Sequence, residues 1–134
     1  MENKEEKTFE EQEFENWCDA NELETDVSKM KEELVGAFED LKKRFTKALK
    51  QQRLVVKGEE LEYTVSKFSP DGFAGDKLTI KAPRGNAFIG TSDDSAKKTM
   101  ALMSAMTGKD IGYFGKLDIR DYLFLTGVVG AFLL

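Results

Sequence analysis

The sequence contains no histidine and a single cysteine, Cys18. Histidine is the commonest general base near neutral pH and a common zinc ligand, so its absence removes the usual routes to acid–base and zinc chemistry. A lone cysteine cannot form a disulfide within the chain, which fits a reducing compartment. The carboxylates are scattered without metal-ligand spacing. The sequence therefore predicts a protein that is not an enzyme and that uses no cofactor or metal.

Membrane segments are also missing from the sequence. The N-terminal residues are acidic and give no secretory signal. The apolar run 122–134 has 13 residues, which as a helix span about 20 Å against the roughly 30 Å of a bilayer core. We therefore expect no contact with a membrane and a location in the cytoplasm.

Charge is distributed unevenly along the chain. The net charge is −5, but residues 1–26 hold eleven acidic and two basic side chains, and the remaining residues hold fourteen acidic and eighteen basic ones. We predict an acidic N-terminal arm over residues 1–26 and one α+β domain over residues 27–134. Such an arm keeps a protein soluble and can lie against a basic surface of the same chain.

The arm contains one predicted short helix. Thr8 and Glu11 have the spacing of a capping box, so a helix is expected from about Phe9. Phe14 and Trp17 share one of its faces. They are interpreted as anchors that dock the arm onto the body, with a partner-binding arm as the alternative.

Residues 27–50 give the clearest helical pattern. Apolar side chains recur at steps of three and four, which places them on one stripe, and Asp26 or Thr25 is the expected cap. A helix of this length measures about 36 Å and is long for so small a domain. Part of the stripe is therefore expected to meet a second copy of the chain, although packing within one chain stays open. The residues assigned to this oligomer helix are Leu34, Phe38, Leu41 and Phe45.

Strand and helix patterns follow in turn. Residues 53–82 alternate in polarity and contain a Pro70-Asp71-Gly72 turn, so they predict a small antiparallel meander or hairpin that needs a helix over one face. A helix is expected over about 94–107, capped by Asp93 or Asp94 and ended by Gly108. A last helix is expected over about 119–134, with Asp118 as its cap and Asp121 placed to suit the helix dipole.

The last helix has almost no polar face. A helix that is apolar all round must be buried over most of its circumference. Two interpretations stay open: it is the central helix of a monomeric core, or it forms a surface for self-association or for a client. Gly127 and Gly130 weaken a helix unless a neighbour approaches the backbone closely.

A basic stretch lies between Leu41 and Lys57. It contains seven lysines and arginines and no acidic residue. A solvated face that receives the acidic arm is the favoured interpretation, because no nucleic-acid motif accompanies the charges. Nucleic acid is thus an unlikely partner.

Three segments, in order, resemble the small tail assembly chaperones of tailed phages. They are KLTIKAP at 77–83, ALMSAMTGKD at 101–110 and KLDIRDYLFLTGVVGAFLL at 116–134, and the resemblance covers roughly residues 60–134. The chain departs from the family pattern at Lys81-Ala82, where Arg-Glu is commoner before proline. The acidic arm and the long helix also extend beyond the usual compact form.

The resemblance implies a non-catalytic protein in the cytoplasm of an infected or prophage-carrying bacterium. It would self-associate and bind the apolar tape measure protein, with tail tube protein as a further partner. Methionine-rich and aliphatic helices suit an adaptable apolar client. The alternatives are a small structural connector of the virion and a nucleic-acid-binding regulator that uses residues 42–57. The residues expected to contact the client or a second copy are Met100, Met103, Met106, Tyr122, Leu125, Val128, Val129 and Phe132.

Overall fold

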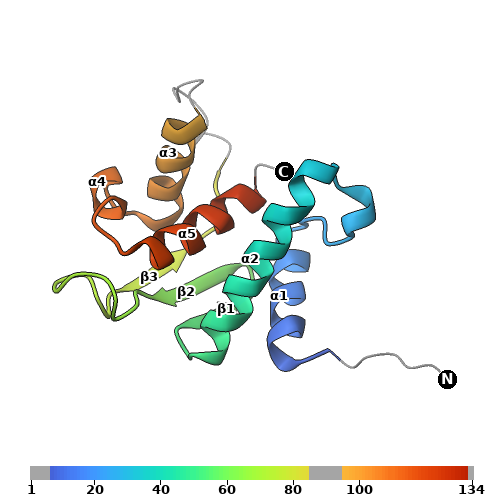
Figure 1. Ribbon diagram of the computed structural model, residues 1–134, viewed down its shortest axis with the longest axis horizontal. Helices are drawn as coiled ribbons and strands as arrows, with labels where there is room; N and C mark the ends of the chain where they lie inside the picture. Colours follow the sequence, from blue (N-terminus) through green and yellow to red (C-terminus); the bar gives the residue numbers. More distant parts are fainter. Residues whose placement is uncertain (1–6, 85–94, 133–134) are drawn as a thin grey trace.

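The computed structural model describes residues 7–84 and 95–132, in which helices pack on one face of a small sheet (Figure 1). In chain order the elements are α1 (Phe9–Ala20), a 3₁₀ turn (Val27–Lys29), α2 (Glu32–Lys50), β1 (Leu54–Lys57), β2 (Glu60–Thr64), β3 (Lys77–Ile80), α3 (Ser95–Thr107), α4 (Ile111–Phe114) and α5 (Ile119–Ala131). The α+β class expected from the sequence is confirmed, with mostly helical content and a three-stranded antiparallel sheet.

The sheet is a meander in the order β1-β2-β3. Leu61 pairs with Ile80 and Tyr63 with Leu78, so these four side chains lie on the same buried face. Alternation along a strand places the other side chains toward solvent, and Val55 on that side is 46% exposed. The helices therefore cover one face of the sheet only, as the sequence required.

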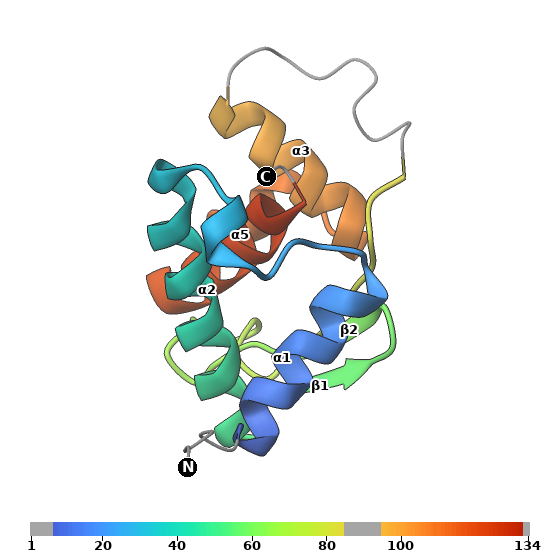
Figure 2. The same cartoon turned by 90° about the vertical axis from the view of Figure 1, so that its right-hand side faces the viewer.

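The acidic arm joins the main hydrophobic core through α1. Thr8 and Glu11 form the capping box that their spacing predicts. Phe14 and Trp17 are buried, and the Phe14 ring lies 4.9 Å from that of Phe45 in α2. Figure 2 shows α1 lying beside α2 and close to β1, in agreement with its contacts to both. The interpretation of the two aromatic residues as anchors is confirmed.

The long helix starts later than expected. Asp26 does cap a helical turn, because its carboxylate accepts a hydrogen bond from the Ser28 amide at 2.9 Å, but that turn ends at Lys29. Met30 then takes an extended conformation with ψ of 154°, and α2 begins at Glu32. The expected helix over 27–50 is therefore corrected to a 3₁₀ turn followed by a 19-residue helix about 28 Å long.

Helix α5 is the central helix of the fold. Its described neighbours include α2 on one side and α3 on the other (Figure 1). Asp118 caps it as predicted, since its carboxylate accepts a hydrogen bond from the Arg120 amide at 2.9 Å. Within the described ranges, no helix is both long enough and apolar enough to cross a membrane.

The connection between α3 and α5 contains one element that the sequence pattern did not indicate. Gly108 ends α3 with a φ of 77°, as expected, but residues 111–114 then form the short helix α4 and bury Phe114. The expected caps of α3, Asp93 and Asp94, lie outside the described residues.

Candidate functional site

Asp121, in the first turn of α5, is fully buried at 0% exposure and fixes the position of this helix. Tyr63 donates its hydroxyl hydrogen to Oδ1 at 2.5 Å, and the Ser66 amide donates to the same atom at 3.0 Å. The hydroxyls of Ser66 and Ser69 donate to Oδ2 at 2.8 and 2.6 Å. Arg53 lies 3.7 Å from Oδ1 and donates to the Tyr63 hydroxyl at 2.8 Å. The carboxylate thus joins α5 to β2 and to the segment that follows β2.

These hydrogen-bond donors also keep the Asp121 carboxyl ionised. Burial penalises the ionised form and by itself raises the pKa of Asp121. The hydrogen bonds from Ser69, Tyr63 and Ser66 outweigh that effect, so the pKa of Asp121 lies below its ordinary value. Burial, and then the hydrogen bond to Asp121, raise the pKa of Tyr63, which keeps the phenol protonated as a donor. We assign this network to structure, because all four of its bonds to the carboxylate hold one helix in place.

An apolar groove runs between α2 and α5 and encloses about 420 Å³. The described residues that form its walls all belong to these two helices. On α5, Leu123 is 37% exposed at its rim. Among the described residues that line the groove, one is charged, namely Asp40. We call this surface the apolar groove; its residues are Leu34, Ala37, Phe38, Asp40, Leu41, Leu123, Thr126, Gly127, Gly130 and Ala131.

Two glycines line the groove on the α5 side. A methyl group at Gly127 would lie 3.2 Å from Cδ1 of Leu41, so the two helices approach closely there. A methyl group at Gly130 would meet no atom of the described residues within 4 Å. The close approach expected for both glycines is therefore present at Gly127 only. Gly130 instead leaves space in the groove.

A second hollow of about 420 Å³ lies at the other end of the α2–α5 contact. Four of its side chains are cationic. Phe68, 52% exposed, lies against one of them, because the Arg120 guanidinium carbon is 3.8 Å from its ring centroid. We call this hollow the basic pocket; its residues are Arg44, Lys47, Ala48, Gln51, Arg53, Tyr63, Ser66, Phe68, Arg120 and Phe124.

Most residues that the sequence assigned to a client or a second copy lie in the core of one chain. The buried ones are Met103, Met106, Leu125, Val128, Val129, Phe38, Leu41 and Phe45. Those left half-buried are Met100, Tyr122, Phe132 and Leu34. Of the two interpretations of the last helix, the central core helix is the one that applies to Asp121–Ala131. Its buried side chains pack against α2 and α3, and Phe124 stacks on Tyr63 of the sheet, so this part of the helix is covered within one chain. A surface for self-association or for a client stays a prediction.

The structure brings three of the predicted residues to one accessible surface. Leu34, Phe38 and Leu41 all line the apolar groove. Phe132 instead packs on Trp17 with ring centroids 5.8 Å apart, and the Tyr122 hydroxyl lies 3.6 Å from Sδ of Met100. Sequence reasoning missed Ala37 and Leu123 as groove residues. Ala37 lies on the apolar stripe of its helix but is small, and Leu123 belongs to a helix that is apolar on almost every side, so the apolar pattern singled out neither of them.

The basic stretch 42–57 does not form one surface. Arg44, Lys47 and Arg53 reach the basic pocket, whereas Lys57 pairs with Glu62 at 3.6 Å. Other members lie toward α1: the pKa of Glu11 is lowered first by hydrogen bonds from Thr8 and then, more weakly, by Lys42 and Lys50. The stretch therefore serves at least two separate parts of the molecule.

No protein-family model matches the chain, and no curated protein or solved structure matches it either. Over the residues that the structure describes, no group of three or more acidic or cysteine side chains is placed to hold a metal ion. The described residues form further hollows of similar volume, and the apolar groove and the basic pocket both lie along the α2–α5 contact.

Proposed function

We propose that the protein is a non-catalytic chaperone of tail assembly in a tailed phage or prophage, acting in the host cytoplasm. In this proposal the apolar groove holds a helical segment of the tape measure protein, and tail tube protein is a second candidate client. The apolar groove is the observation that carries the binding role, and the order of the three motifs supports the family. A groove between two helices suits an amphipathic helix that lays its apolar face into it.

The occupant is a helix of another protein rather than the groove of a second copy. Both surfaces would be concave in a symmetric pairing of two grooves, so the space beside Gly130 would stay unfilled. A convex apolar helix fills that space. Self-association through other surfaces stays a prediction, and light scattering on the purified chain tests it.

The experiment is a pull-down with fragments of a tape measure protein from the phage or prophage that encodes this chain. Leu123→Asp places a charge on the rim of the groove and is expected to weaken binding at least about tenfold, since an apolar contact would then bury an unpaired carboxylate. Ile111→Asp is the matched control, because Ile111 is 50% exposed on α4 and away from the groove. Capture that fails for every fragment, or that Leu123→Asp leaves intact, contradicts the proposal.

A further inference from the structure

The apolar groove and the basic pocket are consecutive parts of one furrow. Along α2, the positions that line them recur at steps of three and four, which places them on a single face. Among these positions, Ala37 and Asp40 belong to the apolar groove, and Arg44, Lys47 and Gln51 belong to the basic pocket. The face is about 21 Å long from the first to the last of these residues.

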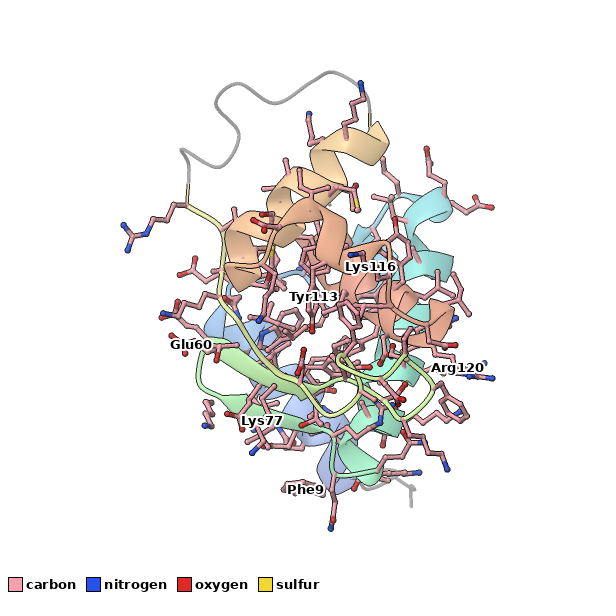
Figure 3. The ribbon with its side chains drawn as sticks, turned by 90° about the vertical axis from the view of Figure 1, so that its left-hand side faces the viewer. Phe9, Glu60, Lys77, Tyr113, Lys116 and Arg120 are labelled. Carbon is pink, nitrogen blue, oxygen red and sulfur yellow. The ribbon has the colours of Figure 1, made fainter. Side chains whose placement is uncertain are left out.

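Helix α5 supplies the opposite wall with the same division. Arg120, Leu123, Gly127 and Gly130 also recur at steps of three and four. Arg120 lines the basic pocket, whereas the other three line the apolar groove. Figure 3 shows Arg120 projecting outward at the edge of the molecule. One side of the α2–α5 contact is therefore apolar over one half and cationic over the other.

The four cationic side chains of the basic pocket differ in how free they are to bind a ligand. Arg53 faces inward to Tyr63 and Asp121. Arg44 binds Asp40 through Nε at 2.9 Å, and Arg120 lies 3.4 Å from the carboxylate of Asp118. Lys47 is exposed and forms no ion pair with any described residue. An incoming carboxylate can therefore bind Lys47 directly, with the half-buried Arg44 and the exposed Arg120 lining the same pocket.

We propose that the furrow recognises an amphipathic helix that carries apolar side chains at one end and an aspartate or glutamate at the other. The proposal rests on the proposed function and defines the client more closely. Ala37 and Lys47 are ten residues apart on α2, or about 15 Å. A client helix lying along α2 thus presents its carboxylate about ten residues from its apolar anchor.

A protein carboxylate fits this furrow better than a nucleic-acid backbone. Arg44 and Arg120, which line the basic pocket with Lys47, are already paired with Asp40 and Asp118. A chain of phosphates would therefore meet a carboxylate beside each of these two arginines. The apolar half would also remain unoccupied by such a backbone. One or two carboxylates on an apolar helix match both halves.

The test measures the affinity of overlapping synthetic peptides from the tape measure protein by fluorescence anisotropy. In each peptide that binds, Asp or Glu is exchanged for Asn or Gln at one end and then at the other. We expect the exchange to affect binding at one end of the peptide and not at the other. At that end it should raise Kd about tenfold, because a charge-assisted hydrogen bond is lost. Lys47→Glu is expected to weaken binding similarly, and a peptide with Lys in place of its acidic residue is expected to restore it.

The outcomes separate the two proposals. If no peptide binds, the proposed function fails. Leu123→Asp abolishing binding, with Kd unchanged by the exchange of carboxylates and by Lys47→Glu, would support binding of the client in the apolar groove. The same result would overturn the inference that the client is recognised through a carboxylate. A single-stranded oligonucleotide that displaces the peptide and depends equally on Lys47 would overturn it in favour of nucleic acid.

Discussion

At the scale of single residues, Asp121 shows how one polar side chain can organise an apolar helix. Its carboxylate accepts four hydrogen bonds in a site closed to solvent. A buried charge without such partners is strongly destabilising, whereas a fully satisfied network fixes a unique arrangement of the elements it joins. Here it holds the first turn of α5 against β2, and so sets the position of one wall of the furrow.

Asp121→Asn is expected to lower the free energy of unfolding by about 3 kcal/mol at pH 7, because an amide replaces an acceptor that satisfies four donors. Since the folded state lowers the pKa of Asp121, its contribution is fully present above the ordinary aspartate pKa of about 4 and is lost as the pH falls below that value. The difference between the two proteins should therefore shrink between pH 7 and pH 3 in urea titrations.

Asp118→Asn is the matched control for this prediction. Asparagine caps a helix about as well as aspartate, so this variant is expected to lose less than about 0.5 kcal/mol. Ser69→Ala removes one donor to Asp121 and is expected to cost about 1–2 kcal/mol, which keeps the test open if Asp121→Asn does not fold. Equal stability of the two Asn variants would contradict the role given to Asp121.

At the scale of elements, α5 combines weak helix propensity with close packing. Gly127 lies against Leu41, where a larger residue would separate α2 from α5. Gly130 has no such neighbour among the residues that the structure describes, and it lines the groove. The two glycines of one helix thus have different physical roles, although they look equivalent in the sequence.

Alanine substitutions distinguish these roles. Gly130→Ala is expected to raise the free energy of unfolding by about 0.5 kcal/mol, since alanine favours a helix and its methyl group meets open space. Gly127→Ala should raise the free energy of unfolding by less than this, or lower it, because its methyl group would lie only 3.2 Å from the buried Leu41 side chain. Chemical denaturation of the two variants measures the difference; the same gain in both would disprove the close approach at Gly127.

At the scale of the whole molecule, the acidic arm is part of the fold through α1. Trp17 contacts Phe45 in α2 and Phe132 after α5, with centroid distances of 5.3 and 5.8 Å. Burial, and then the neighbouring charges of Asp19 and Glu15, raise the pKa of the Cys18 thiol to about 12. The docked arm therefore keeps this thiol protonated and unreactive at neutral pH.

Trp17→Ala is expected to lower the free energy of unfolding by about 3–5 kcal/mol, as for other large buried aromatic side chains. The reaction of Cys18 with a thiol reagent at pH 8 should become at least about tenfold faster, because undocking of α1 exposes the thiol. Phe9→Ala on the same helix is the control, since Phe9 is 69% exposed and should change neither measurement. An unchanged rate in Trp17→Ala would show that α1 does not protect Cys18.

Local patterns in the sequence indicated much of the secondary structure. Apolar spacing located α2, α3 and α5, and Thr8, Asp118 and Gly108 were recognised at helix ends because capping depends on residues close together in the chain. The pattern did not indicate α4 or the break at Met30. A four-residue helix has too few positions for a period, and Met30 fits the helical stripe whether or not its backbone is helical.

The sequence by itself determined which side of α2 and of the strands is apolar, because side-chain periodicity follows from local backbone geometry. Only the tertiary structure decided which of those sides remain accessible. It buried Leu125, Val128 and Val129 under neighbouring elements, while Ala37 and Leu123 were left beside an open groove. It also placed Asp121 among donors up to 58 residues away in the chain. Contacts over such separations depend on how whole elements pack, which no local pattern records.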